Sequence, residues 1–154
     1  SGMSLNIRLV SVNDCDALSD VCFRSKQSNG YDDAFMETCR EELRVMPETL
    51  NEMTLWLAED DDVVLGCAAL QQDTSTQGEV SLFFVDPNVQ GRGVGRMLWT
   101  VVFKAAHERK LSTLVLFSDP NAVGFYAKQG FAEVGTSPSR SIPGRMLPKM
   151  QLSI

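Results

Sequence analysis

The chain has 154 residues, of which 44% are hydrophobic and 22% are charged, and its formal net charge is −6. This length suits one domain with a substantial core, and the negative charge argues against a nucleic-acid partner. The longest apolar run, Val63 to Leu70, is far shorter than the ~20 residues of a membrane span, and no secretory leader follows Met3. We therefore expect a soluble, cytoplasmic protein with no membrane partner. Ser1 and Gly2 are interpreted as a processing remnant outside a single domain of residues 3–154.

The first half of the chain predicts three strands and two helices. The strands show apolar residues in alternation or in short runs, and each helix follows an Asp or Asn that suits an N-cap. A run of three aspartates between the second and third strands is interpreted as a hairpin turn rather than as a metal site. The strands span 5–10, 53–59 and 63–70, the helices begin after Asn13 or Asp14 and after Asp32 or Asp33, and the acidic turn covers 60–62.

The second half continues to alternate strands with helices. One of its strands is apolar throughout, as a central position in a sheet requires. The order β-α-α-β-β-β-α-β-α-β-β predicts the α/β class, with a mixed sheet. The strands span 79–85, 114–117, 131–134 and 149–153, the helices 93–109 and 122–129, and a proline-containing loop 136–148.

The four cysteines and the single histidine do not form a metal-binding pattern. No cysteine has C-x-x-C spacing or a histidine at ligand spacing, and His107 lies among charged residues of a predicted helix. We therefore expect no metal and interpret the cysteines as reduced residues that fill the core. These cysteines are Cys15, Cys22, Cys39 and Cys67.

The most informative segment is a glycine-rich turn between the strand at 79–85 and the helix that follows it. Such a turn presents consecutive backbone N–H groups to a phosphate, at the positive end of the helix. The spacing departs from the dinucleotide pattern G-x-G-x-x-G, because Arg96 stands where the third glycine is required after Gly91. No lysine follows these glycines, which excludes a P-loop. The segment instead reads Q-x-x-G-x-G from Gln90 to Gly95.

At this point the chain resembles the GCN5-related N-acetyltransferase (GNAT) superfamily, whose pyrophosphate loop for acetyl-CoA has the form [QR]-x-x-G-x-[GA]. The strand Glu79-Val80-Ser81-Leu82-Phe83-Phe84-Val85 with its Asp86-Pro87 exit is similar to the family's fourth strand. The segment from Asn121 to Phe131, which begins 31 positions after Gln90, is similar to the family's second signature. The resemblance covers about residues 5–152. It implies the acyl-CoA N-acyltransferase fold, with central strands splayed to admit pantetheine.

The resemblance also implies how acetyl-CoA, the co-substrate, is held. The turn amides bind the pyrophosphate, pantetheine lies along Phe84 and Val85, and Asn121 hydrogen-bonds a pantetheine amide. Arg92 and Arg96 either add charged contacts or stay solvated, and Lys128 either reaches a phosphate or is exposed. The expected cofactor-binding residues are Phe84, Val85, Gln90, Arg92, Gly93, Val94, Gly95, Arg96, Asn121, Tyr126 and Lys128.

Two residues are the candidate catalysts. Glu79 lies six positions before Val85, where well-studied members of the family carry a catalytic glutamate, and is the candidate general base. Its alternative interpretation is a solvent-exposed glutamate at a strand edge. Tyr126 is the candidate general acid that protonates the departing thiolate. The alternative interpretation is a tyrosine that lies between the core and solvent. The backbone N–H of Val85 is expected to polarise the thioester carbonyl.

The acceptor is expected to be a small-molecule primary amine, which the net negative charge mildly favours. Tyr31 and Phe35 are expected in one wall, Ser81 beside Glu79 if no bulge intervenes, and Arg145 as a clamp for a substrate carboxylate. The alternatives are a non-catalytic acyl-CoA-binding or regulatory module, a protein or peptide N-acetyltransferase, and a transferase for a longer acyl group. The sequence leaves open whether a second copy of the chain is a partner in a homodimer.

Overall fold

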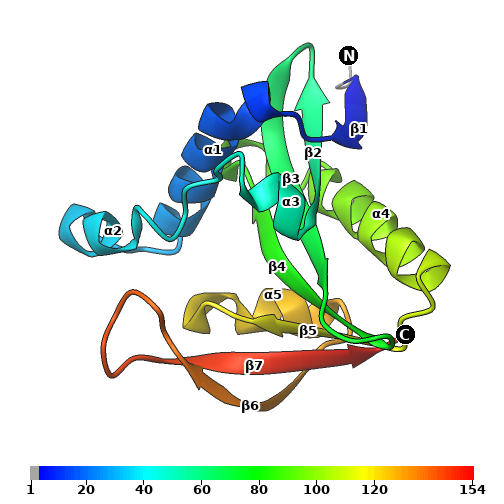
Figure 1. Ribbon diagram of the computed structural model, residues 1–154. Helices are drawn as coiled ribbons and strands as arrows, with labels where there is room; N and C mark the ends of the chain where they lie inside the picture. Colours follow the sequence, from blue (N-terminus) through cyan, green and yellow to red (C-terminus); the bar gives the residue numbers. More distant parts are fainter. Residues whose placement is uncertain (1–3) are drawn as a thin grey trace.

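The computed structural model describes residues 4–154 and forms one twisted seven-stranded sheet, in the order β1-β2-β3-β4-β5-β7-β6 (Figure 1). All neighbouring strands are antiparallel except β4 and β5, which are parallel. The prediction that concerns Ser1 and Gly2 lies outside the described residues. The strands are β1 (Leu5–Leu9), β2 (Thr54–Asp60), β3 (Val63–Gln72), β4 (Gln77–Val85), β5 (Thr113–Phe117), β6 (Ala132–Pro138) and β7 (Met146–Ser153).

Helices cover both faces of the sheet, and each face has its own core. Leu18 of α1 and Met36 of α2 are buried with β2 and β3 side chains in one core. Leu98 of α4 and partly buried Tyr126 of α5 belong to the other, with Phe83 of β4. The short α3 connects α2 to β2. The helices are α1 (Cys15–Gln27), α2 (Asp33–Cys39), α3 (Thr49–Glu52), α4 (Val94–Glu108) and α5 (Val123–Lys128).

The predicted order of elements is confirmed, and the main difference is the length of the last hairpin. β6 extends to Pro138 and β7 begins at Met146, so the connecting loop is shorter than the predicted 136–148. The prolines misled the prediction, because they suggested a loop. Pro148 lies inside β7, where its carbonyl accepts a hydrogen bond from the Ser118 N–H at 2.8 Å.

Several local predictions are resolved by the structure. Asp32 caps α2, because its side chain accepts the Phe35 N–H at 2.8 Å. The acidic turn is a hairpin in which Asp61 and Asp62 have φ of 47° and 69°, the conformation of a type I′ turn. All four cysteines are free and buried, as expected, and Cys22 and Cys67 place their Sγ atoms 3.7 Å apart.

The sheet opens between β4 and β5, which positions everything that follows. Pairing of the two strands covers only Gln77–Glu79 with Thr113–Val115, and no partners are paired beyond Glu79. Figure 1 shows β4 and β5 diverging, with β5, β7 and β6 forming a separate arm. The expected splay of the central strands is confirmed.

Two Asp-Pro-Asn turns end the diverging strands, and both are tied to α1. Asp86 follows β4, caps a short turn through the Asn88 N–H at 2.9 Å and pairs with Arg24 at 2.8 Å. Asp119 lies two residues after the end of β5. Its carboxylate accepts the Asn121 N–H at 2.8 Å and pairs with Lys26 at 3.2 Å. The C-terminal part of α1 thus contacts the turns that follow β4 and β5, one on each side of the opening.

Within residues 4–154, no helix is long and apolar enough to cross a membrane. The same residues contain no group of three or more His, Cys, Asp or Glu side chains placed to hold a metal ion.

The contact between β3 and β4 allows a direct test of the packing. A Cβ added at Gly66 would lie 2.7 Å from the backbone oxygen of Phe84, which cannot move freely because it belongs to the sheet. We expect Gly66→Ala to lower the free energy of unfolding by about 1–3 kcal/mol in chemical denaturation. Gly135→Ala in β6 is the control, since nothing lies within 4 Å of its Cβ. Equal stability of the two variants would contradict this account.

Candidate active site

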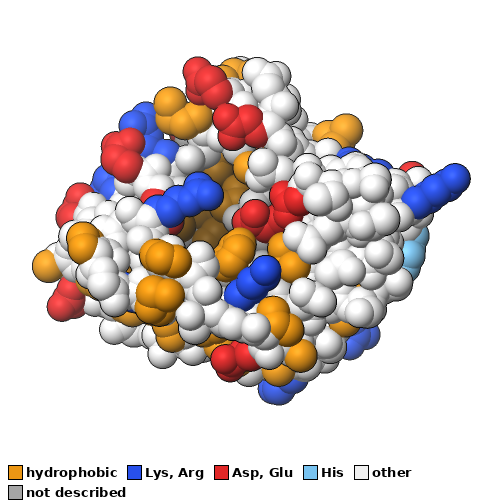
Figure 2. All heavy atoms as spheres, turned by 60° about the horizontal axis from the view of Figure 1, so that its bottom comes forward, with side chains coloured by type: hydrophobic (Ala, Val, Ile, Leu, Met, Phe, Trp, Pro, Cys, Tyr) orange, Lys and Arg blue, Asp and Glu red, His pale blue; other side chains and the backbone are white. Residues whose placement is uncertain are grey.

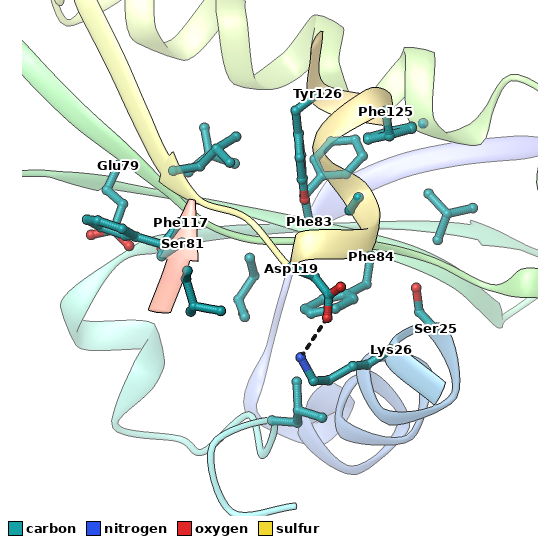
Figure 3. Close-up of a pocket in the computed structure, with 18 of the residues that line it drawn as sticks. Ser25, Lys26, Glu79, Ser81, Phe83, Phe84, Phe117, Asp119, Phe125 and Tyr126 are labelled. Carbon is teal, nitrogen blue, oxygen red and sulfur yellow. Dashed lines mark hydrogen bonds and ion pairs between the residues drawn. The ribbon is translucent and has the colours of Figure 1, made fainter. Parts of the chain in front are cut away.

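A pocket of about 1300 Å³ occupies the opening between β4 and β5. It extends from Glu79 and Ser81 on β4, past Phe84, to the glycine turn and to Tyr126 on α5. Figure 2 shows a hollow with hydrophobic side chains inside, a basic side chain on one rim and acidic side chains on another. Figure 3 shows Glu79 and Ser81 on one side of the pocket and Lys26 with Asp119 on another.

The glycine turn leaves a row of backbone donors without partners. Gly91 and Gly93 have φ of 83° and 86°, a conformation that favours glycine, and Gly93 precedes the first residue of α4. The Met97 N–H donates to the Gly93 carbonyl at 3.1 Å. The four amides from Gly93 to Arg96 have no acceptor within the described residues. This is an anion-binding arrangement.

The Arg92 amide differs from its neighbours, because it donates to the Val89 carbonyl at 3.3 Å. It therefore does not belong to the row of free donors in this structure. Val94 is buried, so only its backbone faces the turn.

A second free donor lies at the edge of β4. The Asp86 N–H donates to the Leu65 carbonyl of β3 at 2.7 Å. Successive N–H groups of a strand point to opposite edges, so the Val85 N–H points away from β3. On that side β5 has already separated from β4. The amide therefore faces the opening.

Glu79 lies where the pairing of β4 with β5 ends, and its carboxylate is directed into the pocket (Figure 3). Burial raises the pKa of this carboxyl and nearby Asp73 adds to the shift, while Arg140 opposes it. No hydrogen bond to this carboxylate occurs within residues 4–154. Glu79 is thus a carboxylate with free lone pairs and increased basicity.

A β-bulge follows Glu79. Leu70 faces Val80 and Ala69 faces Leu82, which leaves Ser81 as the extra residue of β4. The condition for the predicted alternation of Glu79 and Ser81 is therefore not met, although both line the pocket. The bulge brings Val80 and Phe83 into the same core, on the α4 face of the sheet.

Tyr126 approaches the pocket from α5, on the far side from Glu79 in Figure 3. Its ring is held by edge-on contacts with Trp99, Phe125 and Phe131 at 5.1–6.2 Å between centroids. Desolvation raises the pKa of its phenol, and the Asp119 carboxylate contributes further. The hydroxyl therefore stays protonated at neutral pH.

A polar cluster around Asp119 forms another wall. The Tyr31 hydroxyl lies 2.9 and 2.8 Å from the two oxygens of Asp119, and it accepts hydrogen bonds from Arg145 Nη2 at 2.6 Å and Asn121 Nδ2 at 3.0 Å. Lys26 Nζ lies 3.2 Å from Asp119. Burial opposes ionisation of Asp119, but the backbone N–H of Asn121, the Tyr31 hydroxyl and Lys26 hold its pKa below the usual range.

Most of the predicted site residues line the pocket, but the pocket also contains residues that the sequence reasoning missed. Tyr31 and Phe35, predicted in one wall, do not line the pocket: their rings stack at 4.2 Å between centroids behind the wall, and the Tyr31 hydroxyl contacts lining residues. Arg92 and Lys128 do not line the pocket. The missed residues are Lys26 and Asp119. The repeat of Asp-Pro-Asn at 86–88 and 119–121 was an available signal for Asp119. The predicted residues that line the pocket are Glu79, Ser81, Phe84, Val85, Gln90, Gly93, Gly95, Arg96, Asn121, Tyr126 and Arg145.

Comparisons with known proteins agree with this geometry. A sequence model of the acetyltransferase (GNAT) domain matches residues 23–153. The chain is 32% identical to the peptidyl-lysine N-acetyltransferase YjaB of Salmonella typhimurium over 137 residues, 88% of each protein. It is 30% identical to the amino-acid acetyltransferase of Mycobacterium tuberculosis over 86 residues, which cover 54% of this chain and 48% of that protein.

The fold is also similar to that of solved acetyltransferases. The PaiA N-acetyltransferase of Thermoplasma acidophilum, solved in complex with coenzyme A, superposes with a TM-score of 0.80 at 21% identity. The match covers 99% of this chain and 100% of that one. The domain match and the full-length relative together show that this chain belongs to the GNAT acetyltransferase family and is an acetyl-CoA-dependent acyltransferase.

Proposed function

We propose that this protein transfers acetyl from acetyl-CoA to the primary amine of a small molecule, by direct attack in a ternary complex. The observation that carries the proposal is the convergence of free backbone donors and two titratable side chains on one pocket. The amides of Gly93 to Arg96, the Val85 amide, Glu79 and Tyr126 all face the opening of the sheet.

The same donors support a location for acetyl-CoA. The four free amides at the start of α4 suit the pyrophosphate, with Gln90 and the Arg96 side chain beside them. The unpaired edge of β4 at Phe84 and Val85 suits pantetheine, whose amides can replace the missing strand partner. Asn121 lies on the opposite side of the opening and can bind a pantetheine amide. Arg92 and Lys128 remain outside the pocket, so any contact with a phosphate is made by their long side chains.

The chemistry requires one base, one carbonyl donor and one acid. Glu79 accepts a proton from the acceptor's ammonium group, which frees the nitrogen lone pair for attack on the thioester carbon. The Val85 N–H stabilises the negative charge that develops on the carbonyl oxygen as the C–N bond forms. Tyr126 donates its proton to the sulfur when the C–S bond breaks, and is reprotonated when the amide nitrogen loses its second proton.

The loop between β6 and β7 supports a small acceptor. Ser141 Oγ donates to Glu42 at 2.7 Å, and Arg145 donates to Tyr31 at 2.6 Å, so this loop is fastened to the segments after α1 and α2. The loop thus borders the acceptor side of the pocket in a fixed position, which supports a small acceptor over a long peptide. A lysine side chain within a peptide is the second candidate, favoured by the similarity to YjaB along 88% of both proteins.

A non-catalytic role on the same fold is less well supported. A module that only binds acyl-CoA has no use for a partly buried carboxylate with raised basicity in its pocket, or for a partly buried phenol across the pocket from it. The four free, buried cysteines support a reducing compartment, and we place the protein in the cytoplasm.

The glycine turn is tested by Gly93→Glu. The new carboxylate enters open space at the proposed pyrophosphate position, where like charges cost several kcal/mol. We expect acetyl-CoA affinity in calorimetry to fall by about 100-fold or more. Gly93→Ala is the matched control, since it introduces the same positive-φ strain without the charge. Unchanged affinity of Gly93→Glu would refute the assignment of the turn.

The acid is tested by Tyr126→Phe. Phenylalanine keeps the ring contacts with Trp99 and Phe131 and removes only the hydroxyl. We expect kcat in a thiol-release assay to fall by roughly 10²-fold, with acetyl-CoA affinity and thermal stability nearly unchanged. Full activity of this variant would remove Tyr126 from the mechanism.

The base is tested by Glu79→Gln and by the pH dependence of kcat/KM. Because burial raises the pKa of Glu79, the wild-type rate is lost as pH falls through that raised value, above the range of an ordinary glutamate. We expect the variant to lose roughly 10²-fold or more in kcat/KM near neutral pH and to recover partly at high pH, where free amine accumulates.

Glu52→Gln, which changes another pocket-lining carboxylate, is the control for that experiment. It is expected to keep the wild-type pH profile. The same profile in Glu79→Gln would eliminate Glu79 as the base.

A further inference from the structure

The polar cluster around Asp119 has an excess of positive charge. Lys26 and Arg145 face a single carboxylate, and the exposed fractions of these side chains are 14%, 18% and 11% for Lys26, Arg145 and Asp119. Tyr31 contributes no charge, since desolvation and the adjacent Asp119 raise the pKa of its phenol. The cluster therefore carries a net charge of about +1 in a largely desolvated wall.

The cluster also has more hydrogen-bond donors than acceptors. Asp119 is already occupied by the Tyr31 hydroxyl, the Asn121 amide and Lys26. Arg145 uses only Nη2, which donates to Tyr31, so Nε and Nη1 have no protein acceptor within residues 4–154. Lys26 likewise uses one of its three N–H donors. Within residues 4–154, Trp99 Nε1 is the only buried side-chain nitrogen or oxygen without a partner, so Nε and Nη1 of Arg145 are open to solvent and available to an anionic ligand.

Aromatic stacking fixes the direction of the arginine. The Arg145 guanidinium carbon lies 5.3 Å from the centroid of the Tyr31 ring and 5.0 Å from that of Phe35. Contacts over the ring faces leave the planar N–H donors of a guanidinium free for bidentate contact with an oxyanion. Lys26 and Arg145 both line the pocket that contains Glu79.

We propose that Lys26 and Arg145 bind a carboxylate of the acceptor, so that the acceptor class is an amino acid or another amine that carries a carboxylate. The proposal rests on the proposed acetylation of a primary amine. Figure 3 shows Lys26 and Glu79 on different sides of the pocket, with Phe84 on the side of Lys26. The carboxylate is thus held at one side while the ammonium group faces Glu79 at the other.

The phosphates of acetyl-CoA are the other source of an anion. The four free amides of α4 already suit the pyrophosphate, and Lys26 and Arg145 come from α1 and from the loop before β7. The two sources differ in their consequences. A carboxylate site changes acceptor affinity when it is neutralised, whereas a phosphate site changes the affinity for coenzyme A itself.

The test uses matched pairs of amines and the enzyme saturated with coenzyme A. The pairs are lysine with 1,5-diaminopentane, ornithine with 1,4-diaminobutane, and phenylalanine with 2-phenylethylamine. Calorimetry measures the affinity of each member without requiring turnover. We expect the carboxylate-bearing member of at least one pair to bind roughly 10- to 100-fold more tightly, as a charge-assisted hydrogen bond allows.

Arg145→Gln and Lys26→Gln each bring the cluster to neutrality and should remove most of that preference, while coenzyme A affinity stays within about twofold. Using both variants guards against a folding defect in one, which circular dichroism detects. Arg44→Gln is the matched control, because Arg44 lines the same pocket but pairs with Glu41. It is expected to keep the preference.

Three results would overturn the proposal. They are no preference in any pair, a preference that survives both substitutions, and a loss of coenzyme A affinity in place of acceptor affinity. Thiol release separates this inference from the proposed function. Carboxylate-dependent binding without thiol release from acetyl-CoA would refute amine acetylation and leave the carboxylate site standing. Thiol release with equal use of both members of every pair would support amine acetylation and refute the carboxylate site.

Discussion

The site depends on two ion pairs that tie α1 to the ends of the diverging strands. Arg24 pairs with Asp86 after β4, and Lys26 pairs with Asp119 after β5. Both carboxylates are about nine-tenths buried, so removing either cation leaves a desolvated charge without its partner. Arg24 and Lys26 lie two residues apart on one helix, so α1 contacts the segments that follow both diverging strands.

A strand that loses its neighbour presents unpaired N–H and C=O groups, which a protein normally covers. Here the uncovered edge of β4 lies inside the molecule, between two arms of one sheet and close to the free amides of α4. A ligand with alternating amide groups and a terminal diphosphate satisfies both sets of donors. In the proposed binding mode the donor substrate is therefore held through backbone groups, which would explain why glycines rather than lysines dominate the turn.

The cofactor side could be predicted from sequence because its information is local. Gln90 to Gly95 and the strand before them specify a turn and a helix start within a few residues of one another. On the acceptor side Tyr31 and Arg145 were named, but their contacts were not, because Tyr31 meets Asp119 and Arg145 across 88 and 114 positions of the chain. The bulge at Ser81 could not be predicted from the sequence either, since it depends on the register between β3 and β4.

In the proposed mechanism, desolvation serves opposite purposes for Glu79 and Tyr126, two of the titratable side chains of the pocket. Burial disfavours the charged form of each, and so it raises the pKa of both Glu79 and Tyr126. For the carboxylate this means a stronger base, available for an ammonium proton at neutral pH. For the phenol it means a proton that is retained until negative charge develops on sulfur. Because both effects have the same cause, admitting water to the opening would lower both pKa values and weaken the base, while the phenol, with an ordinary pKa of about 10, would keep its proton at neutral pH. The loop before β7, fastened through Arg145 and Ser141 at the border of the pocket, therefore matters to the chemistry as much as to acceptor choice.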